Sequence, residues 1–397
     1  MRIYLDHNAG SPMRPEAREA IFRLIDAEGN PSSIHHSGQR ARRALEMARG
    51  RVASLVGASP RQIVFTSGGT ESNNLAIFGA PRAKRIGGKI RHKIVTSQIE
   101  HSSILAAVSR LESEGFEIIR APVDYDGRID CDAVARAAGG ETALVTLGLA
   151  NSEAGTIQNV SSVADSAKKC GAIFHIDAVQ AAGRIALSAE ALGCDLMTLS
   201  GHKLGAPAGI GALYVRDAAL IEPILSGGPQ EGGLRPGAPN LFGAVAFGAA
   251  AKAVLAGFGE ENARIDLLAS HLLARLRESI PGLRMNGPQS NRLANTLNLT
   301  FPNVLGESML IALDLEGVEV SMGSACAAGA VEPSHVLIAM GRSRAEARSS
   351  LRLSLGWSTR ENEIERAAEI IVRVWNRVRA AEPSSESAVS ESGMEAP

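Results

Sequence analysis

The sequence predicts an α/β fold, with a mostly parallel seven-stranded sheet in a large domain and a smaller α/β domain after it. The first observation is that short apolar runs alternate with segments of helical periodicity between residues 63 and 215. Such alternation is typical of a parallel sheet that helices cover on both faces. The second observation is the length of 397 residues, because single cores stop growing at roughly 250–300 residues.

Seven apolar runs are expected to form the strands of the large sheet. Three helices are expected between them, at residues 71–78, 102–114 and 163–169. In such sheets, ligands bind beyond the carboxyl ends of the strands. The seven strand runs are residues 63–65, 94–96, 118–119, 144–147, 173–176, 196–199 and 212–215.

Composition divides the chain into four expected segments. Residues 1–15 are expected to join the small domain, and residues 16–258 to form the large one. Residues 259–380 form the small domain, which closes with a helix whose apolar residues recur at helical spacing. Residues 381–397 are mostly Ser, Glu and Pro with almost nothing to bury, so we expect a disordered tail.

Bulk composition excludes several classes of protein. The net charge of −1 gives no support for nucleic acid or an anionic membrane as partner. The most apolar stretch, residues 241–258, contains Lys252 and is rich in Ala and Gly, which favours a buried helix over a membrane span. The first residues are too soon charged for a signal peptide, and the four cysteines form no metal-binding pair. These features indicate a cytoplasmic, reducing setting and no metal.

A lysine and an aspartate follow two of the strand runs. Asp177 comes directly after residues 173–176, and Lys203 follows residues 196–199, so both are expected at the carboxyl edge of the sheet. Pyridoxal 5'-phosphate needs an amine for its Schiff base and a carboxylate that keeps its pyridine nitrogen protonated. Either residue alone is more often a surface or turn residue, but other residues at the same edge favour the cofactor.

The same edge carries groups that suit the rest of that cofactor. Gly69 and Thr70 follow a strand run and open a helix, whose first N–H groups are free to bind phosphate. His101 follows another strand run, where its ring could lie on the cofactor or transfer protons. Three further donors are Gln180, expected in the first turn of a helix, and Ser200 and His202, which flank the lysine.

Two residues in the second half of the chain indicate substrate chemistry. Cys326 lies among Gly, Ala and Ser in residues 322–329, which is typical of an exposed loop. A cysteine in such a loop is as often reactive as it is a small structural hydrophobe. Arg352 lies in the alternating, strand-like sequence of residues 349–354. Its guanidinium could bind a substrate carboxylate, and the alternative is a salt bridge at the rim.

The chain resembles the cysteine desulfurases of NifS/IscS type, which are class V members of the fold-type-I pyridoxal-phosphate enzymes. The resemblance runs from residue 4 to about residue 379. It implies pyridoxal 5'-phosphate as the cofactor, L-cysteine as the substrate, a homodimer, and a sulfur-acceptor or iron–sulfur scaffold protein as partner. Its most specific parts are residues 29–33, 67–74, 200–203, 323–326 and 332–337.

The resemblance also implies a role for each residue of the site. The expected catalytic residues are Cys326 as the nucleophile, Lys203 as the carrier of the cofactor, and His101, which stacks on its ring. The expected cofactor contacts are Asp177 at the pyridinium, Gln180 and Ser152 at the phenolic oxygen, and Gly69, Thr70, Ser200 and His202 at the phosphate. The expected substrate contacts are Asn8, Asn151 and Arg352.

Several positions depart from the family pattern, among them residues 9–12, 230–232 and Met322, and two further ones bear on the cofactor. Ser152 replaces an asparagine that contacts the phenolic oxygen, and a serine is shorter but still a donor. Ala238 replaces a threonine in the Gly-rich loop of residues 227–239, which in the family reaches the phosphate of the neighbouring subunit. Both changes are expected to affect cofactor affinity, and neither removes a catalytic group.

Three other functions share parts of this pattern. A selenocysteine lyase would use the same site with a different substrate preference. A class V aminotransferase would not need Cys326, and a non-catalytic sulfur carrier would bind no cofactor. The occurrence of Lys203, Asp177 and Cys326 in one chain favours a desulfurase.

Overall fold

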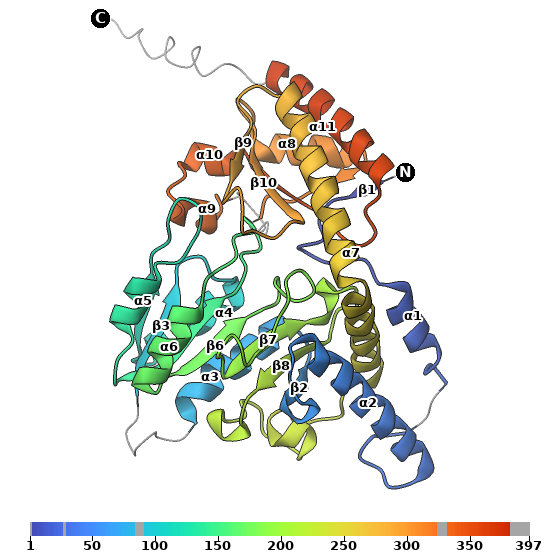
Figure 1. Ribbon diagram of the computed structural model, residues 1–397, viewed down its shortest axis with the longest axis vertical. Helices are drawn as coiled ribbons and strands as arrows, with labels where there is room; N and C mark the ends of the chain where they lie inside the picture. Colours follow the sequence, from blue (N-terminus) through green and yellow to red (C-terminus); the bar gives the residue numbers. More distant parts are fainter. Residues whose placement is uncertain (1, 27–28, 84–90, 324–331, 382–397) are drawn as a thin grey trace, which may run out of the picture.

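A seven-stranded sheet forms the centre of the molecule. The computed structural model describes residues 2–26, 29–83, 91–323 and 332–381 (Figure 1). The strand order is β2-β8-β7-β6-β5-β3-β4, and all strands run parallel except β8, which is antiparallel to both of its neighbours. The predicted fold class is therefore confirmed. The strands are β2 (Ile63–Thr66), β3 (Lys93–Ser97), β4 (Glu117–Ala121), β5 (Thr142–Gly148), β6 (Ile173–Asp177), β7 (Leu196–Ser200) and β8 (Gly211–Val215).

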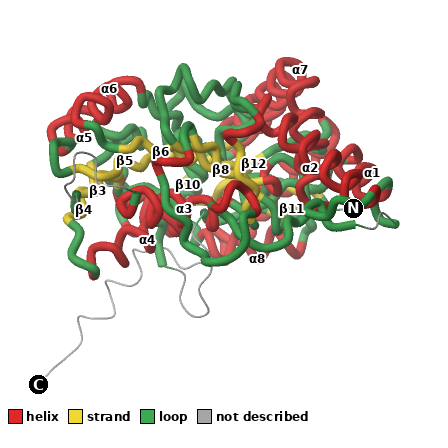
Figure 2. Tube along the Cα trace, turned by 90° about the horizontal axis from the view of Figure 1, so that it is seen from below, coloured by secondary structure: helices red, strands yellow, loops and turns green. Residues whose placement is uncertain are grey.

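Helices cover both faces of this sheet (Figure 2). Alternate residues of one strand enter opposite cores: Val145 of β5 packs in one core and Leu144 in the other. The first core is covered by α1 (Pro15–Phe22), α2 (His36–Leu55), α5 (Cys131–Ala137), α6 (Ser161–Cys170) and the start of α7 (Leu241–Ser279). The second core is covered by α3 (Gly69–Arg82) and α4 (Ser102–Ser113).

Helix α7 connects the two parts of the molecule (Figure 1). Phe247 in its first half lies in the core of the large sheet, and Leu272 in its second half lies in a separate core. The predicted boundary after residue 258 therefore falls inside one continuous helix. Among the described residues, α7 is the one helix long and apolar enough to cross a membrane, and 56% of its most apolar window is buried inside the protein.

The separate core that Leu272 enters belongs to the small domain, and it lies around a three-stranded antiparallel sheet in the order β12-β10-β9. The chain's first strand reaches this part, because β1 (Ile3–Tyr4) pairs in parallel with β11 (Val318–Glu319), and Leu5 is buried in the same core. The other elements here are β9 (Arg284–Asn286), β10 (Thr296–Thr300), α8 (Gly306–Leu315), α9 (His335–Ala339), α10 (Arg344–Arg348), β12 (Ser350–Ser354) and α11 (Glu361–Ala381).

Small residues let α2 and α7 pack closely. A Cβ added to Gly248 would lie 2.7 Å from the Cα of Ala48, so that a larger residue at position 248 would push the helices apart. Helix α2 spans 20 residues and was not among the expected elements. Its buried face combines Leu45, Val52 and Leu55 with glycine, alanines and the buried Arg49, and so the apolar periodicity of its sequence is weak.

A buried residue of α7 gives a direct test of this packing. We expect Phe247→Ala to lower the free energy of unfolding by about 3–5 kcal/mol, since Phe247 is fully buried and its loss leaves a cavity. Phe242→Ala, in the first turn of the same helix and 40% exposed, should cost less than half as much. Urea unfolding followed by circular dichroism measures both, and equal losses would contradict the packing described here.

Candidate functional site

The carboxylate of Asp177 lies at the carboxyl end of the central strand β6, as predicted. Its side chain is held by two donors: Asn73 Nδ2 lies 2.8 Å from Oδ2, and the backbone N–H of Val179 lies 2.9 Å from Oδ1. Asn73 comes from α3, inside the 67–74 segment that the sequence singled out. These bonds fix the direction of the carboxylate at the edge of the sheet.

Lys203 follows the neighbouring strand in a short 3₁₀ turn, Gly201–Lys203. Its Nζ donates to the carbonyl oxygens of Asn8 at 2.5 Å and Ala9 at 2.7 Å. Burial and the nearby charges of Arg184 and Arg352 lower the pKa of this amine from 10.5 to about 7, against the opposing effect of two carboxylates. A large fraction of the amine is therefore neutral at neutral pH, which is the nucleophilic and basic form.

His101 is the N-cap of α4, at the end of the segment that follows β3. Its Nδ1 accepts a hydrogen bond from the backbone N–H of Ser103 at 3.1 Å, so the neutral ring carries its proton on Nε2. The ring is exposed at the edge of the site, but the surrounding protein still removes enough water to lower its pKa. Asp177 opposes this shift, and the positive charges of Lys203 and His335 add to it.

The residues predicted to hold phosphate gather at the start of α3. A Cβ added to Gly69 would lie 2.9 Å from Val179 Cγ2 and 3.5 Å from Ser200 Cβ, so glycine lets the helix end approach β7. Ser200 Oγ lies 2.9 Å from His202 Nδ1, and burial together with the charge of Lys203 lowers the pKa of His202 to about 4. The first N–H groups of a helix have no acceptor within it, so this corner can bind an anion. Thr70 is exposed at the same helix end.

Two of the predicted substrate residues, Asn8 and Arg352, come from the N-terminal segment and the small domain. Arg352 of β12 donates to Asp6 Oδ1 at 2.7 Å and to the carbonyl of Ser152 at 3.3 Å, while its buried Nε has no partner among the described residues. The side-chain amide of Asn8 donates to the same Ser152 carbonyl and to Thr296 Oγ1, each at 2.9 Å. The structure therefore brings Asn8, Ser152 and Arg352 together.

Asn151 and Gln180 hold the backbone around the site. Asn151 Oδ1 accepts from the N–H groups of Glu153 and Ala154, and its Nδ2 donates to a carbonyl. A contact of Asn151 with substrate stays a prediction. Gln180 lies in a turn, and the expectation of a helix there was wrong, because Gly183 adopts a left-handed φ of +75° that ends the turn.

Three charged residues of the site escaped the sequence analysis. Glu100 is buried, accepting from Ser97 Oγ and from the N–H of Gly148, and burial raises its pKa from 4.5 to about 8. Glu153 is buried and accepts from Ser334 Oγ at 2.5 Å. The third is Arg184. Each stands within four residues of a predicted site residue, but no local sequence pattern indicates that distant segments enclose a side chain.

The predicted nucleophile, Cys326, lies outside the described residues. The described residues on either side of it both meet Glu153, because Ser334 donates to that carboxylate and a Cβ on Gly323 would collide with it. Arg352 is close enough to lower the pKa of Glu153, although burial raises it overall. The two flanks of the 324–331 segment thus meet at a carboxylate that interacts with the predicted carboxylate-binding arginine.

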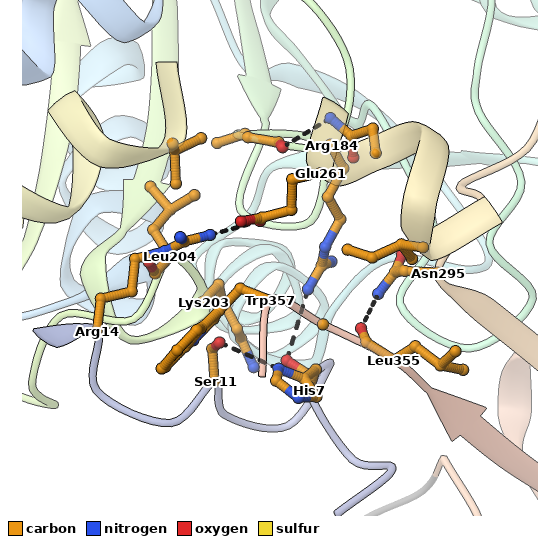
Figure 3. A pocket seen from close by; sticks show the side chains of 16 residues that line it. His7, Ser11, Arg14, Arg184, Lys203, Leu204, Glu261, Asn295, Leu355 and Trp357 are labelled. Carbon is orange, nitrogen blue, oxygen red and sulfur yellow. Dashed lines mark hydrogen bonds and ion pairs between the residues drawn. The ribbon is translucent and has the colours of Figure 1, made fainter. Parts of the chain in front are cut away.

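A pocket lies beside Lys203 on the side that faces α7 (Figure 3). Its walls come from the N-terminal segment, the turn after β6, helix α7 and the residues after β12. Trp357 forms part of the wall and donates from Nε1 to the carbonyl of Pro12 at 3.0 Å. In Figure 3, the side chain of Arg184 extends across the pocket toward His7.

Comparisons with known proteins identify the family of this chain. The model of the class-V aminotransferase family matches residues 3–367. This chain belongs to that family. It is 40% identical to a protein named cysteine desulfurase IscS from Dictyoglomus turgidum over 382 residues, which cover 96% of each protein. The resemblance to NifS/IscS-type cysteine desulfurases is thereby confirmed.

Solved structures agree with this family. A structure described as a NifS-like protein is 32% identical and superimposes with a TM-score of 0.88, covering 95% of this chain and all of that one. A structure described as SspA in complex with cysteine is 34% identical, has a TM-score of 0.79, and covers 89% of this chain and 99% of that one. The class-V members share the pyridoxal-phosphate fold that the sequence predicted.

The raised pKa of Glu100 predicts how stability depends on pH. A carboxyl group whose pKa is higher in the folded protein contributes stability that is present below about 4.5 and is lost as the pH rises to about 8. We therefore expect Glu100→Gln to lose less free energy of unfolding across this range than the unchanged protein. Glu114→Gln, at an exposed helix end, is the control and should keep the original pH dependence. Urea unfolding at several pH values measures this, and parallel curves for all three proteins would rule the assignment out.

Proposed function

We propose that this protein is a pyridoxal-phosphate-dependent cysteine desulfurase. It converts L-cysteine to L-alanine and transfers the sulfur to its own Cys326 as a persulfide, for delivery to iron–sulfur cluster assembly or another acceptor. The observation that carries the proposal is the meeting of Lys203, Asp177 and His101 at one sheet edge, in a chain whose relatives are cysteine desulfurases. The structural relative with bound cysteine supports the choice of substrate.

The side chains at the sheet edge fit pyridoxal 5'-phosphate. The Lys203 amine would attach it, Asp177 would face its pyridine nitrogen, and the neutral His101 ring would lie against it. Its phosphate would take the helix end at Gly69, where a Cβ would fill the space between α3 and Ser200. When bound, the cofactor supplies an electron sink that stabilises negative charge at the substrate Cα.

The residues around that position hold the amino acid and move its proton. Arg352 would bind the substrate carboxylate through its guanidinium, whose Nε has no partner among the described residues. The amine of Lys203, with its pKa near neutrality, is suited to take the Cα proton and return it later. Asn8 orients this amine, because its carbonyl accepts from Nζ.

The sulfur transfer needs no added oxidant. The Cys326 sulfur attacks the sulfur of the substrate, an S–S bond forms, and the C–S bond breaks with its electron pair left on carbon. That carbon then takes up a proton, which gives alanine and a persulfide on Cys326. The thiol is the one cysteine of the chain in a segment of small residues that ends beside Glu153 and Arg352.

The proposal includes a cytoplasmic homodimer in which the Gly-rich loop of residues 227–239 contributes to the partner's site. Within its own chain the loop is anchored by Glu231, which pairs with Arg49 at 2.5 Å and accepts from the N–H of Phe65. Arg235 pairs with Glu71 on α3, one residue after Thr70. The contact with Glu71, one residue from the predicted phosphate contact Thr70, supports a role of this loop near the phosphate. Light scattering tests the dimer, since a monomer would exclude a shared site.

The attachment of the cofactor to Lys203 can be tested directly. Purified protein should be yellow, and borohydride reduction should fix the cofactor to the peptide that contains Lys203. Lys203→Ala should abolish this fixation, whereas Lys93→Ala, a lysine at the distant start of β3, should not affect it. Peptide mass spectrometry locates the adduct, and its recovery on any other lysine would refute the assignment.

The role of Cys326 separates a desulfurase from other uses of the cofactor. Incubation with L-cysteine and no reductant should leave one extra sulfur on Cys326, and Cys326→Ala should reduce sulfide release to background. Cys131→Ala is the matched control and should leave the rate unchanged, because Cys131 lies at the start of α5, outside the site. Normal sulfide release by Cys326→Ala would favour a lyase or aminotransferase that does not use this thiol.

A further inference from the structure

Arg184 is a cation in the pocket wall that has no role in the proposed reaction (Figure 3). One of its terminal nitrogens, Nη1, donates to the backbone carbonyl of Gln180 at 3.0 Å and to the side-chain oxygen Oε1 of the same residue. The other, Nη2, lies 3.5 Å from the carbonyl of His7. All of these acceptors are neutral, and within the described ranges no carboxylate forms an ion pair with Arg184. Its charge is therefore not compensated by a salt bridge.

Gln180 connects this guanidinium to the Lys203 amine. Because Arg184 donates to Oε1, the amide of Gln180 must turn its Nε2 the other way, where it donates to the carbonyl of Asn8 at 3.0 Å. Lys203 donates to the same carbonyl. A flipped amide would place two donors against each other at Arg184. The arginine, the glutamine and the lysine are thus held in one arrangement.

The other charged groups around Lys203 leave Arg184 as its unpaired positive neighbour. Arg352 faces the amine from β12 but is paired with Asp6 at 2.7 Å. Asp6 and Asp177 favour the protonated amine, while burial keeps His7, His101 and His202 from taking up protons at neutral pH. Arg184 itself is partly enclosed, and burial lowers its pKa to about 9, which still leaves it charged at neutral pH.

We propose that Arg184 is a positioning residue of this site, whose unpaired guanidinium, held by Gln180, keeps a positive charge beside the Lys203 amine at neutral pH. That charge opposes protonation of the amine, so Lys203 is available as a base at neutral pH. Removal of the charge should let Lys203 keep its proton to higher pH. The inference rests on the proposed role of Lys203, but it can be tested without the cofactor.

The experiment measures the titration of Lys203 in protein freed of cofactor. Acetic anhydride labels neutral amines, so the labelling of Lys203 across the neutral and alkaline range, followed by peptide mass spectrometry, gives the midpoint of its titration. We expect Arg184→Met to raise this midpoint by about one pH unit. Arg184→Lys keeps a charge at this position and should stay closer to the unchanged protein.

Arg264→Met is the matched control. Arg264 also donates to backbone carbonyls, those of Gly356, Trp357 and Thr359, but does not bond to Gln180 or Lys203. Its replacement should leave the Lys203 midpoint unchanged. If Arg184→Met fails to fold, Arg184→Gln removes the charge with a polar side chain and gives the same test.

Two results would overturn the inference. One is an unchanged Lys203 midpoint in Arg184→Met or Arg184→Gln, and the other is an equal shift in Arg184→Lys and Arg184→Met. Either result would leave the fixation of the cofactor on Lys203 untouched. Conversely, fixation on another lysine would end the proposed function while the titration of Lys203 still reported on Arg184.

Discussion

The backbone carbonyl of Asn8 is the contact on which the site depends. It accepts from Lys203 Nζ and from Gln180 Nε2, and so it joins the turns that follow β7 and β6. The side chain of Asn8 meanwhile donates to Ser152 and to Thr296 of β10 in the small domain. One residue of the N-terminal segment therefore fixes the distance between two strand ends of the large sheet and connects both to the small domain. An irregular segment can do this because its backbone groups are not used in a strand or helix.

The site lies between the large sheet and the small domain, and this explains why its residues come from distant parts of the sequence. Lys203 and Asp177 come from the large sheet, Arg352 comes from β12, and Asp6 pairs with Arg352 from a segment that has just left β1. Helix α7 enters both cores without a break, and its residues Glu261 and Asn262 line the pocket beside Lys203. A rigid helix that crosses the boundary limits how far the arginine and the lysine can move apart, which favours a preorganised site.

Much of the fold could be predicted because the strands of the large sheet, apart from the edge strand β4, are largely buried on both faces. Continuous apolar runs located each strand of the large sheet, and the strand ends then placed Lys203 and Asp177. The turn at Gln180 could not be predicted, because the left-handed Gly183 is one glycine among 41. Nor could the enclosure of Glu100 and Arg184, since their partners come from segments that are distant in the sequence. Local patterns locate strand ends well, but they carry little information about long-range side-chain partners.

The charge at the carboxyl edge of the large sheet depends on which of its ionisable side chains are neutral. Burial raises the pKa of Glu100 to about 8, and the nearby charge of Asp177 adds to this shift, so Glu100 stays protonated up to about pH 8. His175, two residues before Asp177 on β6, is held between the hydroxyls of Thr146 and Thr198, and burial lowers its pKa to about 3. Since neither neighbour is charged at neutral pH, the carboxylate of Asp177 is the charged group at the end of its strand, where Asn73 and the N–H of Val179 donate to it. A cationic ring nitrogen placed there would meet a fixed negative charge that the surrounding strands do not neutralise.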